Sequence, residues 1–108
     1  MNVLVTGAAG LIGGYVAREM LGRGHAVRGF DVREADVPGV EWILGDLRDL
    51  DVMEQAVDGM DAVCHLAAIP NSRPREEWPE VVDINWRGTY IVMEAMARRG
   101  VRRVVFAS

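Results

Sequence analysis

The residues whose types and spacing most directly suggest chemistry form the glycine-rich run Gly7-Ala8-Ala9-Gly10-Leu11-Ile12-Gly13. Gly7 would allow a sharp turn, Gly10 would let the backbone approach a pyrophosphate, and Gly13 would let a helix pack closely on a strand. Backbone N–H groups and the positive end of a helix dipole would then face the phosphates. The alternative is a plain turn with helix-packing glycines. The run lies between an expected strand and an expected helix, and this position favours phosphate binding.

Two carboxylates follow at the ends of expected strands. Asp31 lies about 20 positions beyond the glycines, where a carboxylate can accept hydrogen bonds from the hydroxyls of an adenosine ribose. Asp31 could instead be a turn residue that ends a strand, and Asp46 could be a helix cap. The expected strands share an edge at their carboxyl ends, and ligands bind at this edge of an open parallel sheet. The residues placed there are Thr6-Gly7, Asp31, Asp46, Ala67-Ala68 and Ser108.

Asn85, His65 and Cys64 are further candidates for chemistry. Asn85 lies on the apolar stripe of the longest expected helix, so its buried amide must find partners. Those partners are either neighbouring backbone groups, as a purely structural bond, or a cofactor or the loop after the fourth strand. His65 is expected to be packed or locally hydrogen-bonded rather than a base or a metal ligand, and we assign no metal. Cys64, the single cysteine, is expected to be a buried inert thiol.

Short apolar runs alternate with segments of helical period, which predicts an α/β fold with a parallel sheet of about five strands and right-handed crossovers. One link strains this topology, since residues 32–40 are fewer than a crossover usually needs. The segment 69–79 is expected to be a loop. Strands are expected at residues 2–6, 27–31, 41–44, 62–66 and 103–107, and helices at 11–21, 49–57 and 80–98, in one domain spanning 1–108.

Composition narrows the class of protein. Half of the residues are apolar and the formal net charge is -4, which fits a folded α/β domain and argues against a nucleic-acid partner. No apolar run approaches the ~20 residues that cross a bilayer, and the start lacks the features of a signal peptide. We therefore expect a cytoplasmic protein without a membrane partner.

These motifs together resemble the extended short-chain dehydrogenase/reductase family, which includes NAD-dependent nucleotide-sugar epimerases and dehydratases. The resemblance also draws on Gly45-Asp46-Leu47-Arg48-Asp49, His65-Leu66-Ala67-Ala68, Asn85-Trp86-Arg87-Gly88-Thr89 and Val104-Val105-Phe106-Ala107-Ser108, and spans the whole chain. It implies a Rossmann-like, doubly wound sheet that holds NAD. The implied cofactor-binding residues are Gly7, Ala9, Gly10, Leu11, Ile12 and Gly13 at the pyrophosphate, Asp31 at the ribose, Asp46 and Leu47 at the adenine, Leu66, Ala67 and Ala68 along the middle, Asn85 behind it, and Ala107 and Ser108 toward the nicotinamide.

Asp31 also predicts NAD rather than NADP, because its carboxylate would face the 2′-phosphate of NADP. The competing feature is Arg33, since an arginine near this position can accommodate that phosphate.

The sequence departs from the family at the catalytic pair Tyr-x-x-x-Lys. All 12 basic residues are arginine, and Tyr15 and Tyr90 are followed four residues later by Glu19 and Glu94. Ser108 aligns one residue short of the catalytic hydroxyl. We therefore expect a truncated chain, inactive alone, that forms the cofactor half of an epimerase/dehydratase-like enzyme or sugar oxidoreductase acting on a nucleotide sugar or sugar acid. The alternative is a non-catalytic dinucleotide-binding sensor or partner-dependent module. The apolar fifth strand would be a sheet edge, so self-association is expected.

Overall fold

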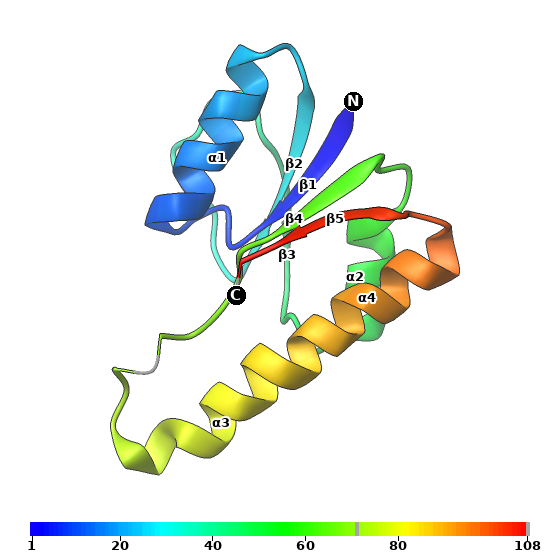
Figure 1. Ribbon diagram of the computed structural model, residues 1–108. Coiled ribbons are helices and arrows are strands. Elements are labelled where there is room, and N and C mark those ends of the chain that lie inside the picture. Colours follow the sequence, from blue (N-terminus) through cyan, green and yellow to red (C-terminus); the bar gives the residue numbers. More distant parts are fainter. Residues whose placement is uncertain (71, 108) are drawn as a thin grey trace.

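The computed structural model describes residues 1–70 and 72–107, and these form a single parallel five-stranded sheet in the order β3-β2-β1-β4-β5 (Figure 1). The central strand β1 pairs with β2 on one side and with β4 on the other. The chain therefore builds outward in one direction and then crosses back over β1. The expected Rossmann-like parallel sheet is confirmed, with strands β1 (Asn2–Thr6), β2 (Ala26–Asp31), β3 (Glu41–Leu44), β4 (Ala62–His65) and β5 (Arg103–Phe106).

Both faces of the inner strands are covered, and their alternate side chains point to opposite layers, whereas β5 stays exposed. Val3 and Val5 pack toward α1 (Leu11–Gly22), and Leu4 packs into a second cluster that includes Val57 and Val92. Figure 1 shows α1 on one side of the sheet and α2 (Leu50–Val57) with α4 (Gly88–Arg99) on the other. The strands read as continuous apolar runs for this reason.

The link from β2 to β3 crosses the α1 side of the sheet without a helix or strand of its own, as expected for residues 32–40. Val37 is buried in this link, and Ala35 and Val40 pack against the same cluster. The turn before β3 includes Gly39, whose φ of 93° lies in the left-handed region that glycine tolerates. The apolar residues of this short link thus cover a part of the sheet that a crossover helix would otherwise cover.

The long helical region begins earlier than the sequence predicted, and it is not uniform. The predicted helix 80–98 is preceded by η1 (Arg75–Glu77) and begins at α3 (Trp78–Val82), so the expectation that 69–79 is all loop was wrong at its C-terminal end. Pro79 stands in the first turn of α3, where a missing N–H costs nothing. Between α3 and α4 lies a π-helical segment, η2 (Asp83–Arg87). No helix among the described residues is both long and apolar enough to span a membrane.

Candidate functional site

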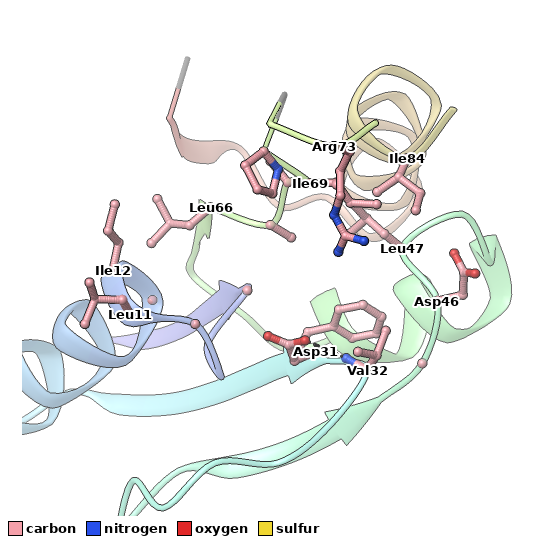
Figure 2. Close-up of a pocket in the computed structure, with 18 residues that line it drawn as sticks. Leu11, Ile12, Asp31, Val32, Asp46, Leu47, Leu66, Ile69, Arg73 and Ile84 are labelled. Carbon is pink, nitrogen blue, oxygen red and sulfur yellow. Dashed lines mark hydrogen bonds between the residues drawn. The ribbon is translucent and has the colours of Figure 1, made fainter. Parts of the chain in front are cut away.

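A cavity of about 750 Å³ opens at the carboxyl ends of the strands. Figure 2 shows Leu11 and Ile12 of α1 on one side of this cavity, Leu47 and Ile84 on the other, and Asp31 between them. The cavity lies where the chain reverses direction across β1, the place where ligands bind in doubly wound sheets. Fold topology and cavity position therefore agree.

The glycine-rich run forms one wall of the cavity and is too tight for side chains. Gly7 has a φ of 73°, and a Cβ there would stand 2.9 Å from Cα of Ala67. A Cβ on Gly13 would overlap the carbonyl oxygen of Gly7 and stand 2.7 Å from its carbonyl carbon. Gly10 instead has an ordinary φ of -80° and donates its N–H to the Gly7 carbonyl at 3.0 Å. The three glycines thus serve a left-handed turn, a close helix approach and an open surface facing the cavity.

The start of α1 presents its backbone N–H groups without a local partner. Among the described residues no side chain caps this end, and the first turn carries no acidic residue. The start of α2 is different, because the Asp49 side chain accepts hydrogen bonds from the N–H groups of Asp51 and Val52. The uncapped, positive end of α1 faces the cavity, and such an end favours an anion.

Asp31 ends β2 beside the glycine-rich run and is fixed by backbone donors. Its Oδ2 accepts a hydrogen bond from the N–H of Ala9 at 3.0 Å, and its Oδ1 accepts one from Val32 at 2.7 Å. Each carboxylate oxygen keeps a free acceptor site for a ligand. The Arg33 side chain turns to the same loop and donates to the Ala9 carbonyl at 3.2 Å.

Asp46 is held in place at the other end of the cavity by Arg48. The Arg48 guanidinium contacts Asp46 at 2.7 Å and reaches Asp83 of η2 at 2.9 Å. Hydrogen bonds from Arg48 lower the pKa of Asp46 to about 2, so this carboxylate is ionised at neutral pH. Asp46 does not cap α2, since Asp49 does so.

The segment after β4 forms the third wall. Thr6 Oγ1 accepts hydrogen bonds from the N–H groups of Leu66 and Ala67, at 3.0 and 3.1 Å. The Asn85 amide binds both backbone groups of Ile69, accepting from its N–H at 2.8 Å and donating to its carbonyl at 2.9 Å. Of the alternatives for Asn85, the structure shows that its partners are the backbone of the loop after β4.

Most of the residues expected to hold a ligand do line the cavity. Three do not line it: the N–H of Ala9 donates to Asp31, the Asn85 amide binds Ile69, and the N–H of Ala107 donates to the His65 carbonyl at 3.3 Å. Ser108 lies outside the described residues. Those that line it are Gly7, Gly10, Leu11, Ile12, Gly13, Asp31, Asp46, Leu47, Leu66, Ala67 and Ala68.

Seven further lining residues were missed. Phe30, Val32 and Gly45 adjoin expected site residues, so adjacency in sequence was a usable signal for them. Of the lining residues that the structure describes, Arg73 alone is basic, and its side chain hangs into the cavity from the loop after β4 (Figure 2). The remaining missed residues are Ile69, Pro70 and Ile84.

His65 and Cys64 both lie in the interior and not on the cavity surface. His65 is 1% exposed, and its ring nitrogens contact the hydroxyls of Thr6 at 2.7 Å and Thr89 at 3.0 Å. Burial lowers the pKa of His65 to about 4 and raises the pKa of the Cys64 thiol. A packed, locally bonded histidine is what the sequence predicted.

The sequence of this chain is similar to those of known proteins. Residues 3–108 match the model of the NAD dependent epimerase/dehydratase family. The L-arabinose 1-dehydrogenase (NAD(P)(+)) of Haloferax volcanii is 42% identical over 99% of this chain and 40% of its own length. Sterol demethylase protein B of Methylococcus capsulatus is 40% identical over 100% of this chain and 34% of its own.

A solved structure shares the fold of this chain. The UDP-glucose-4-epimerase of Stenotrophomonas maltophila, with bound NAD and formylated UDP-arabinopyranose, superposes with a TM-score of 0.91 at 32% identity, over 100% of this chain and 37% of that one. The chain thus spans between a third and two-fifths of the length of these relatives.

Proposed function

Because this chain belongs to the NAD dependent epimerase/dehydratase family, we propose that it binds NAD and forms the adenosine and pyrophosphate half of the cofactor site. Membership confirms the family resemblance of its motifs. NAD is confirmed as the cofactor of the family, since the matching epimerase structure holds it. The part that each residue of this chain plays in binding is our proposal.

The observation that carries the proposal is the cavity between the uncapped start of α1 and the carboxylate of Asp31. A pyrophosphate fits against this wall because Gly10 leaves no Cβ in its way and the first turn of α1 offers free N–H donors. Asp31 is placed to accept hydrogen bonds from the ribose hydroxyls. In the same proposal, Asp46 and Leu47 border the adenine, and Leu66, Ala67 and Ala68 line the middle of the cofactor, with Ala107 and Ser108 toward the nicotinamide.

Isothermal titration calorimetry of NAD against NADP tests this proposal on the complete natural polypeptide that carries these residues. Hydrogen bonds to a charged group contribute about 1.5 to 3 kcal/mol, so NAD should bind about ten- to a hundredfold more tightly than NADP. Asp31→Asn should reduce the preference for NAD over NADP. Arg33→Ala is the matched control and should leave that preference unchanged. Failure to bind either dinucleotide would overturn the proposed function. Tighter NADP binding that is lost in Arg33→Ala would overturn the role of Asp31.

For the parent activity we propose the cofactor half of an epimerase, dehydratase or dehydrogenase acting on a sugar acid or nucleotide sugar. The names of two of the three relatives reported above, an L-arabinose dehydrogenase and a UDP-glucose epimerase, support a sugar, whereas the name of the third, a sterol demethylase protein, does not. When bound, NAD supplies hydride transfer. In this proposal the residues of this chain bind and orient the cofactor. The Tyr-x-x-x-Lys pair is not among them, since these 108 residues contain no lysine.

A second candidate function is a non-catalytic dinucleotide-binding sensor or partner-dependent module, in which the same cavity holds the cofactor without turnover. A turnover assay of the complete natural polypeptide with NAD and a panel of nucleotide sugars and sugar acids separates the two functions. Formation of NADH or of an epimer supports the enzyme. Cofactor binding without any turnover supports the sensor.

A further inference from the structure

A continuous chain of hydrogen bonds runs behind the cavity, from β1 through β4 to the long helical region, buried at Thr6 and His65 and partly buried at Thr89 and Asn85. Thr6 Oγ1 contacts Nδ1 of His65 at 2.7 Å, and Nε2 of His65 contacts Thr89 Oγ1 at 3.0 Å. Thr89 Oγ1 in turn donates to the Asn85 carbonyl at 2.6 Å. We call these four residues, Thr6, His65, Thr89 and Asn85, the relay. None of the proposed contacts to NAD uses His65 or Thr89.

The position of every proton in the relay follows from counting donors and acceptors. A carbonyl only accepts, so the Thr89 hydroxyl gives its proton to Asn85, and Nε2 of His65 must then carry the proton donated to Thr89. Thr6 Oγ1 already accepts two N–H groups, from Leu66 and Ala67. Its own proton therefore goes to Nδ1 of His65, which is the bare nitrogen. The relay admits only the neutral Nε2–H imidazole.

The relay holds the wall formed by residues 66–69 at both ends. Thr6 holds the N–H groups of Leu66 and Ala67, and Asn85 holds both backbone groups of Ile69. Ala67 lies so close to the glycine-rich run that a Cβ on Gly7 would stand 2.9 Å from its Cα. The separation of the two cavity walls therefore depends on where the relay places this segment.

We propose that His65 is a positioning residue for the cofactor, which spaces Thr6 from Thr89 and thereby sets the wall 66–69 against the glycine-rich run. This inference rests on the proposed NAD site. It assigns His65 no contact with NAD and no proton transfer. The ring is held by Thr6 of β1, by Thr89 of α4 and by the stacked ring of Phe106 of β5, with centroids 5.7 Å apart. Within residues 1–70 and 72–107, no acidic or basic side chain hydrogen-bonds or ion-pairs with it.

The matched variants Thr89→Val and Thr89→Ser test the proposal with little change of shape. Valine leaves the Nε2–H of His65 without an acceptor, whereas serine keeps the hydroxyl. Leaving a buried donor unsatisfied is costly, so Thr89→Val should raise the Kd for NAD and for ADP-ribose about tenfold. AMP does not reach the wall 66–69 in the proposed binding mode, so its Kd should change less than about twofold in Thr89→Val. In Thr89→Ser the Kd values of AMP, ADP-ribose and NAD should all stay close to those of the unsubstituted protein.

The readouts separate a positioning role from a merely structural one. Circular dichroism identifies the temperature at which all variants are folded, and titrations are made there. Equal loss of affinity for AMP, ADP-ribose and NAD would reduce the relay to general stability and overturn the proposal. Unchanged NAD affinity in Thr89→Val would also overturn it while leaving the proposed function intact. If the unsubstituted protein binds no NAD, the proposed function itself fails.

A second measurement needs no ligand and no variant. Nitrogen-15 NMR of the His65 ring in the unsubstituted protein at neutral pH should show a proton on Nε2 and a bare Nδ1. A proton on Nδ1 would contradict the relay directly.

Discussion

Replacing Gly13 with alanine tests the tight packing that forms the phosphate-facing wall. A Cβ at this position would overlap the Gly7 carbonyl oxygen and approach the Gly7 carbon to 2.7 Å and the Ala8 Cα to 2.9 Å. All of these neighbours are backbone atoms, so the clash can be removed only if the start of α1 moves away from Gly7 and Ala8. Moving the Gly7 carbonyl also strains its 3.0 Å hydrogen bond from Gly10.

The expected cost follows from two opposing effects. Overpacking a close contact costs about 1 to 3 kcal/mol, and a clash with backbone on several sides belongs at the upper end. Alanine in place of glycine returns up to ~1 kcal/mol of helix propensity. The net destabilisation of Gly13→Ala should therefore be about 2 kcal/mol, which lowers Tm by about 8 to 16 °C in a domain of this size.

The neighbouring Gly14 supplies the matched control. A Cβ there would meet the Arg18 guanidinium at 3.2 Å and the Ala8 carbonyl oxygen at 3.7 Å. The arginine is a flexible side chain that, among the described residues, is held only by an exposed hydrogen bond to the Asp36 carbonyl at 3.2 Å, so it can shift. Gly14→Ala should therefore keep or raise Tm, by up to ~1 kcal/mol of added stability. Thermal unfolding of both variants by calorimetry decides the matter. If Gly13→Ala melts at the same temperature as Gly14→Ala, the close approach of α1 to the glycine-rich run is not as tight as the structure has it.

Four further outcomes are expected. Gly10→Ala should lower the Tm much less than Gly13→Ala, because its new Cβ would stand 3.3 Å from the Gly7 carbonyl oxygen, a tight contact but not an overlap. It should nevertheless weaken NAD binding about tenfold in calorimetric titration by crowding the pyrophosphate, and an unchanged Kd would contradict that placement. Burial lowers the pKa of His65 from 6.5 to about 4. The neutral ring therefore contributes fully to the free energy of unfolding above about pH 6.5, and this contribution is lost as the pH falls through 4. Urea titrations should therefore show about 2 kcal/mol less stability at pH 5 than at pH 7, a difference absent in His65→Phe. The exposed apolar side chains of edge strand β5, with Val105 64% and Phe106 51% exposed, predict concentration-dependent association of the 108-residue chain in analytical ultracentrifugation, and a strictly monomeric chain would count against it. The same chain should give no NADH or epimer with NAD and nucleotide sugars above a buffer blank, since the acid–base pair of the family is missing from it.

Local patterns were sufficient to predict the sheet and the near wall of the cavity. The strands are continuous apolar runs closed by turn residues, and Gly7, Gly10 and Gly13 belong to one run whose role follows from their spacing. Asp31 could be placed because the end of a parallel strand is also a position at the ligand-binding edge. In each case the sequence signal lies within a few residues along the chain, although the contacts that it serves, such as Gly7 against Ala67, join distant segments.

The far wall could not be predicted in the same way, since it depends on contacts between distant segments. Arg73 and Ile84 reach the cavity only because the loop after β4 and η2 fold over it. The π-helical turn at Asp83–Arg87 has no counterpart in a 3.6-residue period, and sequence reasoning therefore expected a uniform helix. Asn85 was recognised as a polar residue on an apolar stripe, but its partner Ile69 lies 16 residues away across a loop.

The two walls of the cavity therefore differ in how they are held, and this explains why a small domain keeps a polar relay in its interior. The glycine-rich wall is fixed by backbone conformation and needs no partner beyond α1 and β2. The wall 66–69 has no such local constraint, because it leaves β4 as an irregular segment with backbone groups that must be satisfied. The relay satisfies four of them: Thr6 binds the N–H groups of Leu66 and Ala67, and Asn85 binds both backbone groups of Ile69. His65 and Thr89 link these two anchors by hydrogen bonds. A fully satisfied buried network costs little stability and permits one geometry, whereas an apolar replacement would leave the segment free to shift. The position of the second wall is thus set by the only interior residues that join β1, β4 and the long helical region through side-chain hydrogen bonds in the part of the chain that the structure describes.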